Sequence, residues 1–466
     1  MEIERFRAEA HRLVDWMADY LRDVGRERVV PTTAPGQVRA QLPKSPPATG
    51  EDFEAVRADF DRIIYPGLTH WAHPGFFGYF PANHSPPSIL AEMMTAAMGV
   101  NTMSWQTSPA ATELEQVVID WLRQMVGLPD TFTGVIQDYA STATLVAMIT
   151  ARDRDRSALD RATAYISAEA HSSNAKGARL AGFAPELIRL VPTDQRYAMR
   201  TDALEAMIAE DRGAGLVPTV IAATLGTTSS TGFDPVPEIA AIAKREHTWL
   251  HVDAAFAGSA AIVPELRWIM DGVEHADSVV INPHKWLLVN HDCSAYFVRD
   301  TEALRRSMST SPAYLRTRFD DEVVNYRDWG IPLGRRFRAL KLWFVIRCYG
   351  VEALQAMIRE HIRIGKLFAS WVEEDPQFEL VAPAPVGLVC FRWQPEGTKL
   401  SPEALERANR LLHERINAPG DWFLSHTVLG GRYVIRLALG HLSTTEAMIR
   451  SLWDRIREAA RGLESA

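Results

Sequence analysis

The pattern of apolar and polar positions changes twice along the chain, which predicts three structural parts. Residues 2–24 place apolar side chains at helical spacing, and a proline-rich linker follows them. From about residue 110 onward, short apolar runs alternate with helical patterns, an order typical of a mostly parallel sheet covered by helices. The expected strands are residues 134–137, 163–168, 217–225, 248–253, 279–281 and 294–299.

The last part of the chain is a compact mixture of helices and strands. A basic and then strongly apolar helical pattern over 334–350 leads into it. Two glycines, Gly430 and Gly431, precede its second strand and indicate a hairpin. The expected elements are strands 387–393 and 433–437 and helices 402–416 and 444–461.

The N-terminal helix carries so broad an apolar stripe that it needs a surface to pack on. Because a loose linker follows it, that surface need not belong to the same subunit. Packing within its own chain is the alternative. Together the patterns predict an N-terminal helical segment (1–83), a large α/β domain (84–342) and a smaller C-terminal α+β domain (343–466).

Length and composition are those of an ordinary globular protein. Of the 466 residues, 47% are hydrophobic and 23% are charged. The net charge of -8 argues against nucleic acid as the main partner. No apolar run reaches membrane-spanning length, and the N-terminus lacks the pattern of a signal peptide, so we expect no membrane partner. Three widely spaced cysteines form no metal-binding pattern and suggest a reducing compartment, hence a cytoplasmic protein.

The first candidate for chemistry is Lys285, in the stretch SVVINPHKWLLV (278–289). It stands between two apolar runs, although a lysine at a turn is ordinarily a surface residue. Burial lowers the proton affinity of an amine and makes it a usable nucleophile. Such an amine can form a Schiff base with a carbonyl substrate or with pyridoxal phosphate (PLP).

The second candidate, Asp253, ends the apolar run TWLHVD (248–253), and small residues follow it. In PLP sites a carboxylate commonly pairs with the ring nitrogen and keeps it protonated. An acid at a strand end also fits the magnesium-binding acid of a P-loop NTPase, but the chain has no G-x-x-x-x-G-K-[ST] stretch. An acid and a lysine at the ends of successive strands therefore favour a PLP site.

Two longer motifs, HVDAAFAGSA (251–260) and NPHKWLLVNHDCSA (282–295), resemble the aromatic-L-amino-acid decarboxylase family, the group II PLP-dependent decarboxylases. The similarity runs from FRAEAHRLVDWMADY (6–20) to the last helix. It implies the PLP-dependent transferase fold of type I, PLP as the cofactor and no metal. It also implies a homodimer with the active site at the subunit interface, and decarboxylation of an aromatic L-amino acid to the arylalkylamine and CO2.

The resemblance gives catalytic roles to three residues of the cofactor site. Lys285 binds PLP, Asp253 pairs with the ring nitrogen, and His171 stacks on the ring face and takes part in catalysis. From the residues alone, a histidine after a strand is more often a hydrogen-bonded structural residue. The further cofactor contacts are Ala140, Ser141, Thr228, Ala255, Asn282 and His284.

Residues 138–142 open a helix with small and polar side chains, and a helix N-terminus is a ready phosphate site. Simple N-capping is the alternative from the local sequence. The resemblance favours phosphate, with Ala140 and Ser141 at matching positions. Asp138 would repel a phosphate, so we do not expect it to be a ligand.

The stretch YPGLTHWAHPGFFGYFP (65–81) predicts a loop that displays aromatic rings, because glycine and proline interrupt it. A flat, apolar substrate suits such a loop. Asn101 and Met103, where the animal dopa decarboxylases have apolar or aromatic residues, leave the preferred ring open. The resemblance places in the substrate pocket Trp71, Tyr79, Phe80 and Pro81, with Asn101 and Met103 from across the dimer interface.

Residues 307–328 have little apolar periodicity, which is typical of a functional lid. Tyr314 lies where the family has its catalytic-loop tyrosine, the residue thought to protonate the carbanion after CO2 leaves. Aromatic aldehyde synthases of plants typically have phenylalanine there. An unremarkable exposed tyrosine is the alternative.

Other functions stay open on the same scaffold. His171 and Tyr314 weigh against an aromatic aldehyde synthase, and the aromatic loop weighs against a decarboxylase of a non-aromatic amino acid. A scaffold protein that keeps the fold without PLP is a third alternative. It would be colourless and would have no adduct on Lys285.

Overall fold

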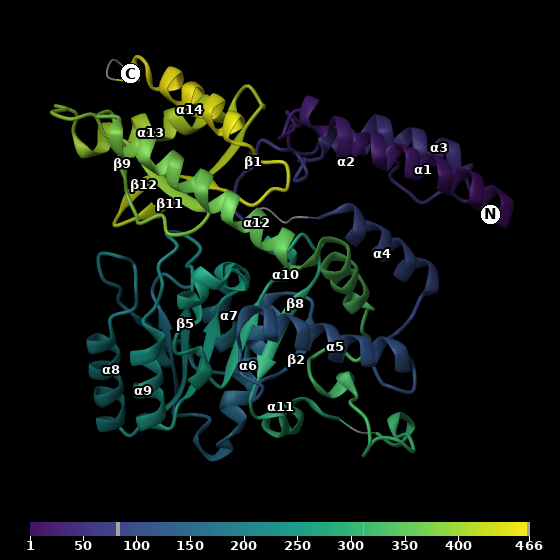
Figure 1. Cartoon of the computed structure of the whole chain (residues 1–466), viewed down its shortest axis with the longest axis vertical. Helices are drawn as coiled ribbons and strands as arrows, with labels where there is room; N and C mark the ends of the chain where they lie inside the picture. Colours follow the sequence, from purple (N-terminus) through teal and green to yellow (C-terminus); the bar gives the residue numbers. More distant parts are fainter. Residues whose placement is uncertain (81–83, 311, 464–466) are drawn as a thin grey trace.

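The computed structural model describes residues 1–80, 84–310 and 312–463. Within these ranges, seven strands form one sheet in the large unit, in the order β2-β8-β7-β6-β5-β3-β4 (Figure 1). Neighbouring strands are parallel except where β8 pairs with β2 and β7, so the mostly parallel α/β sheet is confirmed. The strands are β2 (Thr133–Gln137), β3 (Ala162–Ser167), β4 (Ile188–Val191), β5 (Val217–Thr224), β6 (Trp249–Asp253), β7 (Ser278–Ile281) and β8 (Ser294–Val298).

Strand β4 was not predicted from the sequence. It lies at one edge of the sheet, where Leu190 is exposed and Arg189 interrupts the apolar residues. A short edge strand buries few of its side chains, so it lacks the continuous apolar run that marks the central strands.

Helices cover both faces of the sheet because its strands bury side chains on both sides. Along β5, Val220 packs in a core with α6 and α7, whereas the next residue, Ile221, packs in a core with α5, α8 and α9. This three-layer arrangement leaves the carboxyl ends of the parallel strands free to build a site. The helices are α5 (Pro109–Val126), α6 (Ala140–Asp153), α7 (Ser173–Leu180), α8 (Thr201–Gly213), α9 (Val236–Glu246) and α11 (Thr301–Met308).

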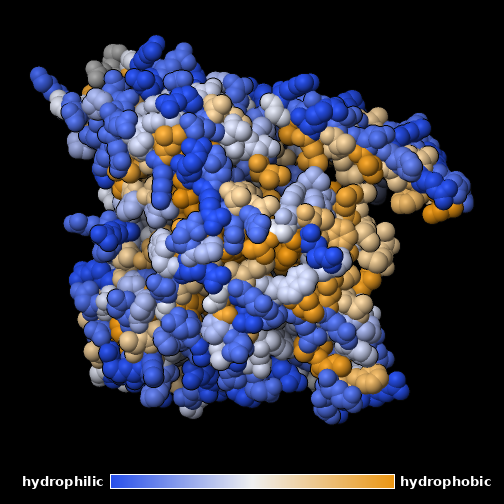
Figure 2. Space-filling model, viewed as in Figure 1, coloured by the Kyte–Doolittle hydropathy of each residue, from blue (hydrophilic) through white to orange (hydrophobic). Residues whose placement is uncertain are grey.

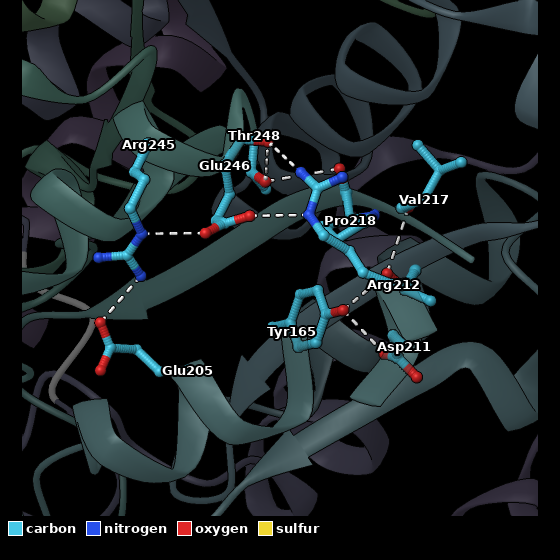
Figure 3. Close-up of polar contacts among 10 residues, drawn as sticks. Tyr165, Glu205, Asp211, Arg212, Val217, Pro218, Arg245, Glu246 and Thr248 are labelled. Atoms are coloured by element: carbon cyan, nitrogen blue, oxygen red, sulfur yellow. Dashed lines mark hydrogen bonds and ion pairs between the residues drawn. The ribbon is translucent and has the colours of Figure 1, made fainter. Parts of the chain in front are cut away.

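A polar network ties α8 and α9 to each other and to the sheet (Figure 3). Tyr165 of β3 donates a hydrogen bond of 2.7 Å to Asp211 of α8, and Arg212 contacts Glu246 of α9 at 2.8 Å. Exposed ion pairs of this kind contribute at most about 1 kcal/mol each, whereas the buried tyrosine bond fixes α8 against β3. The network is structural and takes no part in the candidate site.

In the described residues, the C-terminal unit has a five-stranded sheet in the order β1-β11-β12-β10-β9 (Figure 1). The predicted strands and helices of this unit are confirmed, and β9 and β11 are additions. β11 forms with β12 the hairpin that Gly430 and Gly431 indicated. The elements are β9 (Phe378–Leu380), β10 (Leu388–Trp393), α13 (Pro402–Asn417), β11 (Phe423–Leu429), β12 (Arg432–Ala438) and α14 (Glu446–Ala460).

Strand β1 (Phe76–Phe77) comes from the aromatic stretch that was expected to be only a loop. It pairs in parallel with β11, so part of that stretch belongs to the C-terminal sheet. A Cβ at Gly78 would lie 2.4 Å from the Phe423 ring, and this close approach requires glycine. The glycines that suggested a loop therefore allow a short strand to pack here.

The long helix α12 (Arg338–Glu374) joins the large and C-terminal units. It contacts α4 and α5 at one end and β9, β10 and α14 at the other, with a kink at Gly350, whose φ is 73°. The predicted domain boundary at residue 342 lies inside this helix, and the division into domains stays a prediction.

The N-terminal helices project to one side of the body (Figure 1). The predicted first helix is confirmed as α1. The rings of its Trp16 and Tyr20 each pack edge-on against the Tyr65 ring, with ring centres 6.2 Å apart. None of the helices in the described ranges combines the length and apolarity needed to cross a membrane. The helices are α1 (Ile3–Asp23), α2 (Gln37–Gln41), α3 (Phe53–Asp59) and α4 (Pro86–Met98).

Candidate active site

One cavity of about 220 Å³ lies where β5, β6 and β7 end and α6 begins. All nine residues expected to contact the cofactor line it, and the aromatic Phe80 lines it too. Ligands of open α/β sheets commonly bind beyond the carboxyl ends of the strands. The lining residues are Phe80, Tyr139, Ala140, Ser141, His171, Ser173, Thr224, Gly226, Thr228, Asp253, Ala255, Phe256, Asn282, His284, Lys285 and His291.

Lys285 reaches the cavity from the short helix α10 (Pro283–Trp286), which follows β7 directly. Its backbone N–H donates to the carbonyl of Asn282 at 3.0 Å, and its Nζ lies 5.6 Å from the centre of the Phe80 ring. Burial lowers the pKa of Lys285, and the charge of Asp253 partly opposes that change. The side chain therefore offers an amine close to an acid in one enclosed space.

Asp253 ends β6 and is only 4% exposed. One carboxylate oxygen accepts from the side-chain amide of Asn174 at 2.9 Å, and the other accepts from the backbone N–H of Ala255 at 3.1 Å. These two bonds fix the carboxylate in the cavity wall. The electrostatic influence of Asp253 on both Lys285 and His171 shows that the three groups share one site.

Two histidines of the cavity are held as neutral rings. His171 accepts the backbone N–H of Ser173 on Nδ1 at 3.2 Å, and His284 accepts the N–H of Cys293 on Nδ1 at 3.1 Å. Burial lowers the pKa of His171 and brings that of His284 to about 3. With Nδ1 as the acceptor, each neutral ring carries its proton on Nε2 and can donate it to a ligand.

The N-terminus of α6 supplies the part of the cavity expected to bind phosphate. The helix begins at Ala140, two residues later than the sequence suggested, and Tyr139 is its extended N-cap residue. The first turn of a helix has N–H groups without intrahelical acceptors. In α6 this turn begins with Ala140 and Ser141, which both line the cavity. Asp138 is absent from the lining and accepts from the N–H of Tyr139 at 2.7 Å.

PLP fits this set of residues. In the described part of the chain, Thr224 Oγ1 and Asn174 Oδ1 are buried without a hydrogen-bond partner. Thr224 lines the cavity, and Asn174 is bonded to Asp253. The site thus combines an amine for an aldehyde, an acid for a ring nitrogen and a helix N-terminus for a phosphate. Lys285, Asp253, His171 and the α6 terminus would hold the cofactor.

The residues expected around the substrate side chain divide into two groups. Phe80 lines the cavity, whereas Trp71 and Tyr79 stack on each other, with ring centres 5.7 Å apart, outside its lining. Pro81 lies outside the described residues. Trp71 and Tyr79 are 39% and 54% exposed, so their rings are available to a further surface.

Asn101, Met103 and Tyr314 do not line the cavity of their own chain. Asn101 accepts from the N–H groups of Met103 and Arg335, which fixes this segment against the start of α12. Tyr314 lies in the short helical turn η9 (Ala313–Leu315) and is 78% exposed. The roles of these three residues stay predictions.

Sequence reasoning missed some cavity residues for which it had signals. Ser173 follows His171 by two residues, Thr224 is the next-to-last residue of the predicted strand 217–225, and Phe256 follows Ala255. Gly226 was not missed, because the sequence indicates a small-residue turn at 226–228 that can approach a cofactor closely. Its φ is 80°, and a Cβ there would lie 2.7 Å from that of Ala257, so the turn requires glycine.

Other residues had no local signal. Tyr139 and His291 are distant in sequence, but the centres of their rings lie 5.6 Å apart. Arg436 of β12 is 3% exposed, and its guanidinium carbon lies 5.6 Å from the centre of the Phe80 ring. It donates to the Thr228 carbonyl, whereas its Nε has no partner in the described residues. Among the residues that the structure describes, no carboxylate forms an ion pair with Arg436, and such a buried cation suits a ligand that carries one.

Comparisons with known proteins agree with this geometry over the whole chain. The family described as "Pyridoxal-dependent decarboxylase conserved domain" matches residues 35–394. Phenylacetaldehyde synthase of Arabidopsis thaliana is 42% identical over 475 residues, covering 99% of this chain and 96% of the relative. Tyrosine decarboxylase 2 of Narcissus pseudonarcissus is 42% identical over 478 residues, covering 99% and 95%. A solved structure of Oryza sativa TDC with PLP and tryptamine superposes with a TM-score of 0.96 at 40% identity, covering 99% of this chain and 98% of that one.

Proposed function

Because the chain belongs to the pyridoxal-dependent decarboxylase family, with its type I fold and its PLP cofactor, we propose that it decarboxylates an aromatic L-amino acid to the arylalkylamine and CO2. The observation that carries the proposal is the single cavity that brings the amine of Lys285 and the carboxylate of Asp253 together. The relatives named for tyrosine and the complex with tryptamine support an aromatic substrate.

Three residues of the cavity, Lys285, Asp253 and His171, have defined tasks in this reaction. When bound, PLP supplies a conjugated ring that accepts the electron pair left as the bond to the carboxylate breaks. Lys285 holds the cofactor aldehyde, and Asp253, fixed by Asn174 and Ala255, keeps a proton on the ring nitrogen. The neutral ring of His171 lines the cavity and would flank the cofactor, limiting the planes it could adopt.

Two features near Phe80 favour an aromatic amino acid as the substrate. Its side chain would pack against the Phe80 ring, and its carboxylate would be attracted by Arg436, a buried cation near that ring but outside the cavity lining. Electrostatic attraction in an enclosed site is stronger than in water, which favours an amino acid over the amine product. The product therefore leaves with its attraction to Arg436 lost.

The same scaffold can release an aldehyde, since phenylacetaldehyde synthase is as similar to this chain as tyrosine decarboxylase 2 is. Overall identity does not separate the two outcomes. Tyr314 supports decarboxylation, because a phenol can deliver a proton to the substrate α-carbon and phenylalanine cannot. Simple decarboxylation is thus the proposed outcome, and aldehyde formation is the second candidate.

We propose a homodimer as the working form. Apolar surface gathers around α4, between the N-terminal helices and the large unit (Figure 2). Leu90, Met93, Met94 and Met98 of α4 are all exposed, and so is Phe6 of α1. Exposed apolar patches of this extent commonly mark an interface. A second copy would cover them and bring Tyr314, Asn101 and Met103 to its partner's cavity.

We place the protein in the cytoplasm. Cys293, Cys348 and Cys390 are free thiols, two of them buried. Unpaired cysteines are typical of a reducing compartment.

The function is tested with the PLP-loaded protein and a panel of aromatic L-amino acids. Release of one CO2 and one arylalkylamine per substrate is expected for at least one of tryptophan, tyrosine, phenylalanine and dopa. Ammonia and an aldehyde in place of the amine would establish the second candidate. No CO2 from any member of the panel would contradict both.

The dimer is tested with a hybrid of one Lys285→Ala subunit and one Tyr314→Phe subunit, separated by two affinity tags. If Tyr314 acts in the partner's cavity, the hybrid keeps one complete site and forms amine at about half the rate of the parent dimer. Both homodimers serve as controls, because neither has a complete site. A hybrid that releases only aldehyde, like the Tyr314→Phe homodimer, would show that Tyr314 serves its own chain.

A further inference from the structure

A line of stacked rings leaves the cavity and ends in the C-terminal unit. Phe80 stacks on Phe256, with ring centres 3.6 Å apart and planes 18° apart. Phe256 stacks on Trp286 at 4.7 Å and 10°. Phe80 and Phe256 line the cavity, whereas Trp286, the residue after Lys285, is fully buried behind them.

The far end of the line is fixed by His361 of α12. The indole N–H of Trp286 donates to Nδ1 of His361 at 3.0 Å, and the two rings are 10° from parallel. Since Nδ1 accepts, the neutral imidazole carries its proton on Nε2 and donates it to the carbonyl of His441 at 3.0 Å. His361, which is 2% exposed, therefore accepts from the indole on one ring nitrogen and donates to the carbonyl from the other.

The indole has little room to turn on its other side. A Cβ at Gly387 would lie 3.2 Å from Trp286 Cζ2 and 3.0 Å from the carbonyl of Leu439, so the backbone of the C-terminal unit presses against the ring. Stacking alone leaves rotation within the ring planes nearly free, whereas a hydrogen bond to the indole N–H fixes it. The bond to His361 and the close backbone at Gly387 thus hold the orientation of the indole together, and the bond is the restraint that fixes its N–H edge.

We propose that His361 is a positioning residue that, through Trp286, sets the plane of the Phe256–Phe80 wall and so the affinity for a flat substrate side chain. The inference rests on the proposed function for its substrate, but the state of the stack itself is independent of it. His361 does not line the cavity, and its side chain bonds to Trp286 and to the carbonyl of His441. It links the long helix α12 to substrate selection in the large unit.

Two substitutions of His361 separate this role from simple packing. Glutamine can accept the indole N–H on its side-chain oxygen and donate from its nitrogen to the His441 carbonyl, whereas leucine can do neither. For His361→Leu we expect KM for aromatic amino acids to rise about tenfold while kcat stays within about threefold. For His361→Gln both constants should stay within about twofold of the parent.

The control is His413→Leu. His413 of α13 also uses both ring nitrogens, contacting the Tyr433 hydroxyl and the Leu424 carbonyl at 2.7 Å each, but it lies outside the cavity lining. The His413→Leu protein should have a lower melting temperature, as the His361→Leu protein does, but an unchanged KM. A His361→Leu protein that melts earlier with an unchanged KM, or a His361→Gln protein as impaired as His361→Leu, would overturn the proposal.

A spectroscopic measurement keeps the test independent of turnover. Near-ultraviolet circular dichroism of the PLP-loaded protein reports the fixed asymmetry of stacked aromatic rings. The band that Trp286→Phe removes should be lost in His361→Leu and kept in His361→Gln, even if no aromatic amino acid were decarboxylated. The same band in all His361 variants would overturn the inference and leave the proposed function untouched.

Discussion

At the scale of single residues, the chemistry of the site follows from burial. Lys285 loses proton affinity because it is removed from water, and His284 and His361 stay neutral for the same reason. The sequence could predict Lys285 because its apolar flanks are local. It could not predict Arg436 or His361, because their contacts join segments far apart in the chain.

Buried neutral histidines also predict how stability depends on pH. Burial lowers the pKa of His251, His361 and His441 to about 4 each. In the unfolded chain each of them would have a pKa of about 6.5. Between about pH 4 and this value the unfolded state therefore binds more protons than the folded state. The neutral histidines therefore contribute their full stabilisation of the folded state above about pH 6.5. Between this pH and about pH 4, each histidine lowers the free energy of unfolding by about 1.4 kcal/mol per pH unit.

Thermal melting from pH 8 to pH 5 checks this. The midpoint should fall below about pH 6.5 because the three histidines outweigh the buried Asp234, whose pKa burial raises to about 7 and which acts in the opposite direction. His361→Gln removes one of these groups and should make the fall shallower. A midpoint that stays constant from pH 7 to pH 5 would contradict the assignment of neutral histidines.

At the scale of elements, predictability depended on how local the pattern is. The central strands were predicted within one or two residues because both of their faces are buried. The edge strand β4, the short strand β1 and the helix α2 were missed, since partners elsewhere in the chain stabilise them more than their own sequences do. A helix opening at residues 138–142 was predicted correctly, but in the structure α6 begins at Ala140.

The α6 terminus can be tested with a charge. Ser141→Asp should weaken PLP binding at least tenfold, because two unit charges about 5 Å apart repel by about 3 kcal/mol at an effective dielectric constant of about 20. An acid at a helix N-terminus otherwise stabilises the helix. The measurement is the dissociation constant of PLP from the apoprotein.

Ser108→Asp is the matched control, because Ser108 is the N-cap residue of α5 and does not line the cavity. Its PLP dissociation constant should equal that of the parent. If Ser141→Asp bound PLP as tightly as this control does, the phosphate would not lie at the α6 terminus.

At the scale of the whole molecule, one chain builds the cofactor site but not every expected substrate contact. The nine residues expected to contact the cofactor gather in one cavity because the strand ends, α6 and α10 meet there. Tyr314, Asn101 and Met103 stay outside it, and no single-chain pattern reveals where a partner would place them. The sequence could assign these three residues only by resemblance, which is why the dimer needs its own test.

The central claim is that Lys285 holds PLP opposite Asp253 in this cavity. The most direct test is the visible absorbance of the purified PLP-loaded protein before and after borohydride, followed by mapping of the modified lysine. We expect a visible band that borohydride bleaches, with the label on Lys285; Lys176→Ala, which removes an exposed lysine of α7, should behave like the parent. Lys285→Ala should lose the band. A visible band and turnover retained in Lys285→Ala, or a label on another lysine, would contradict the account.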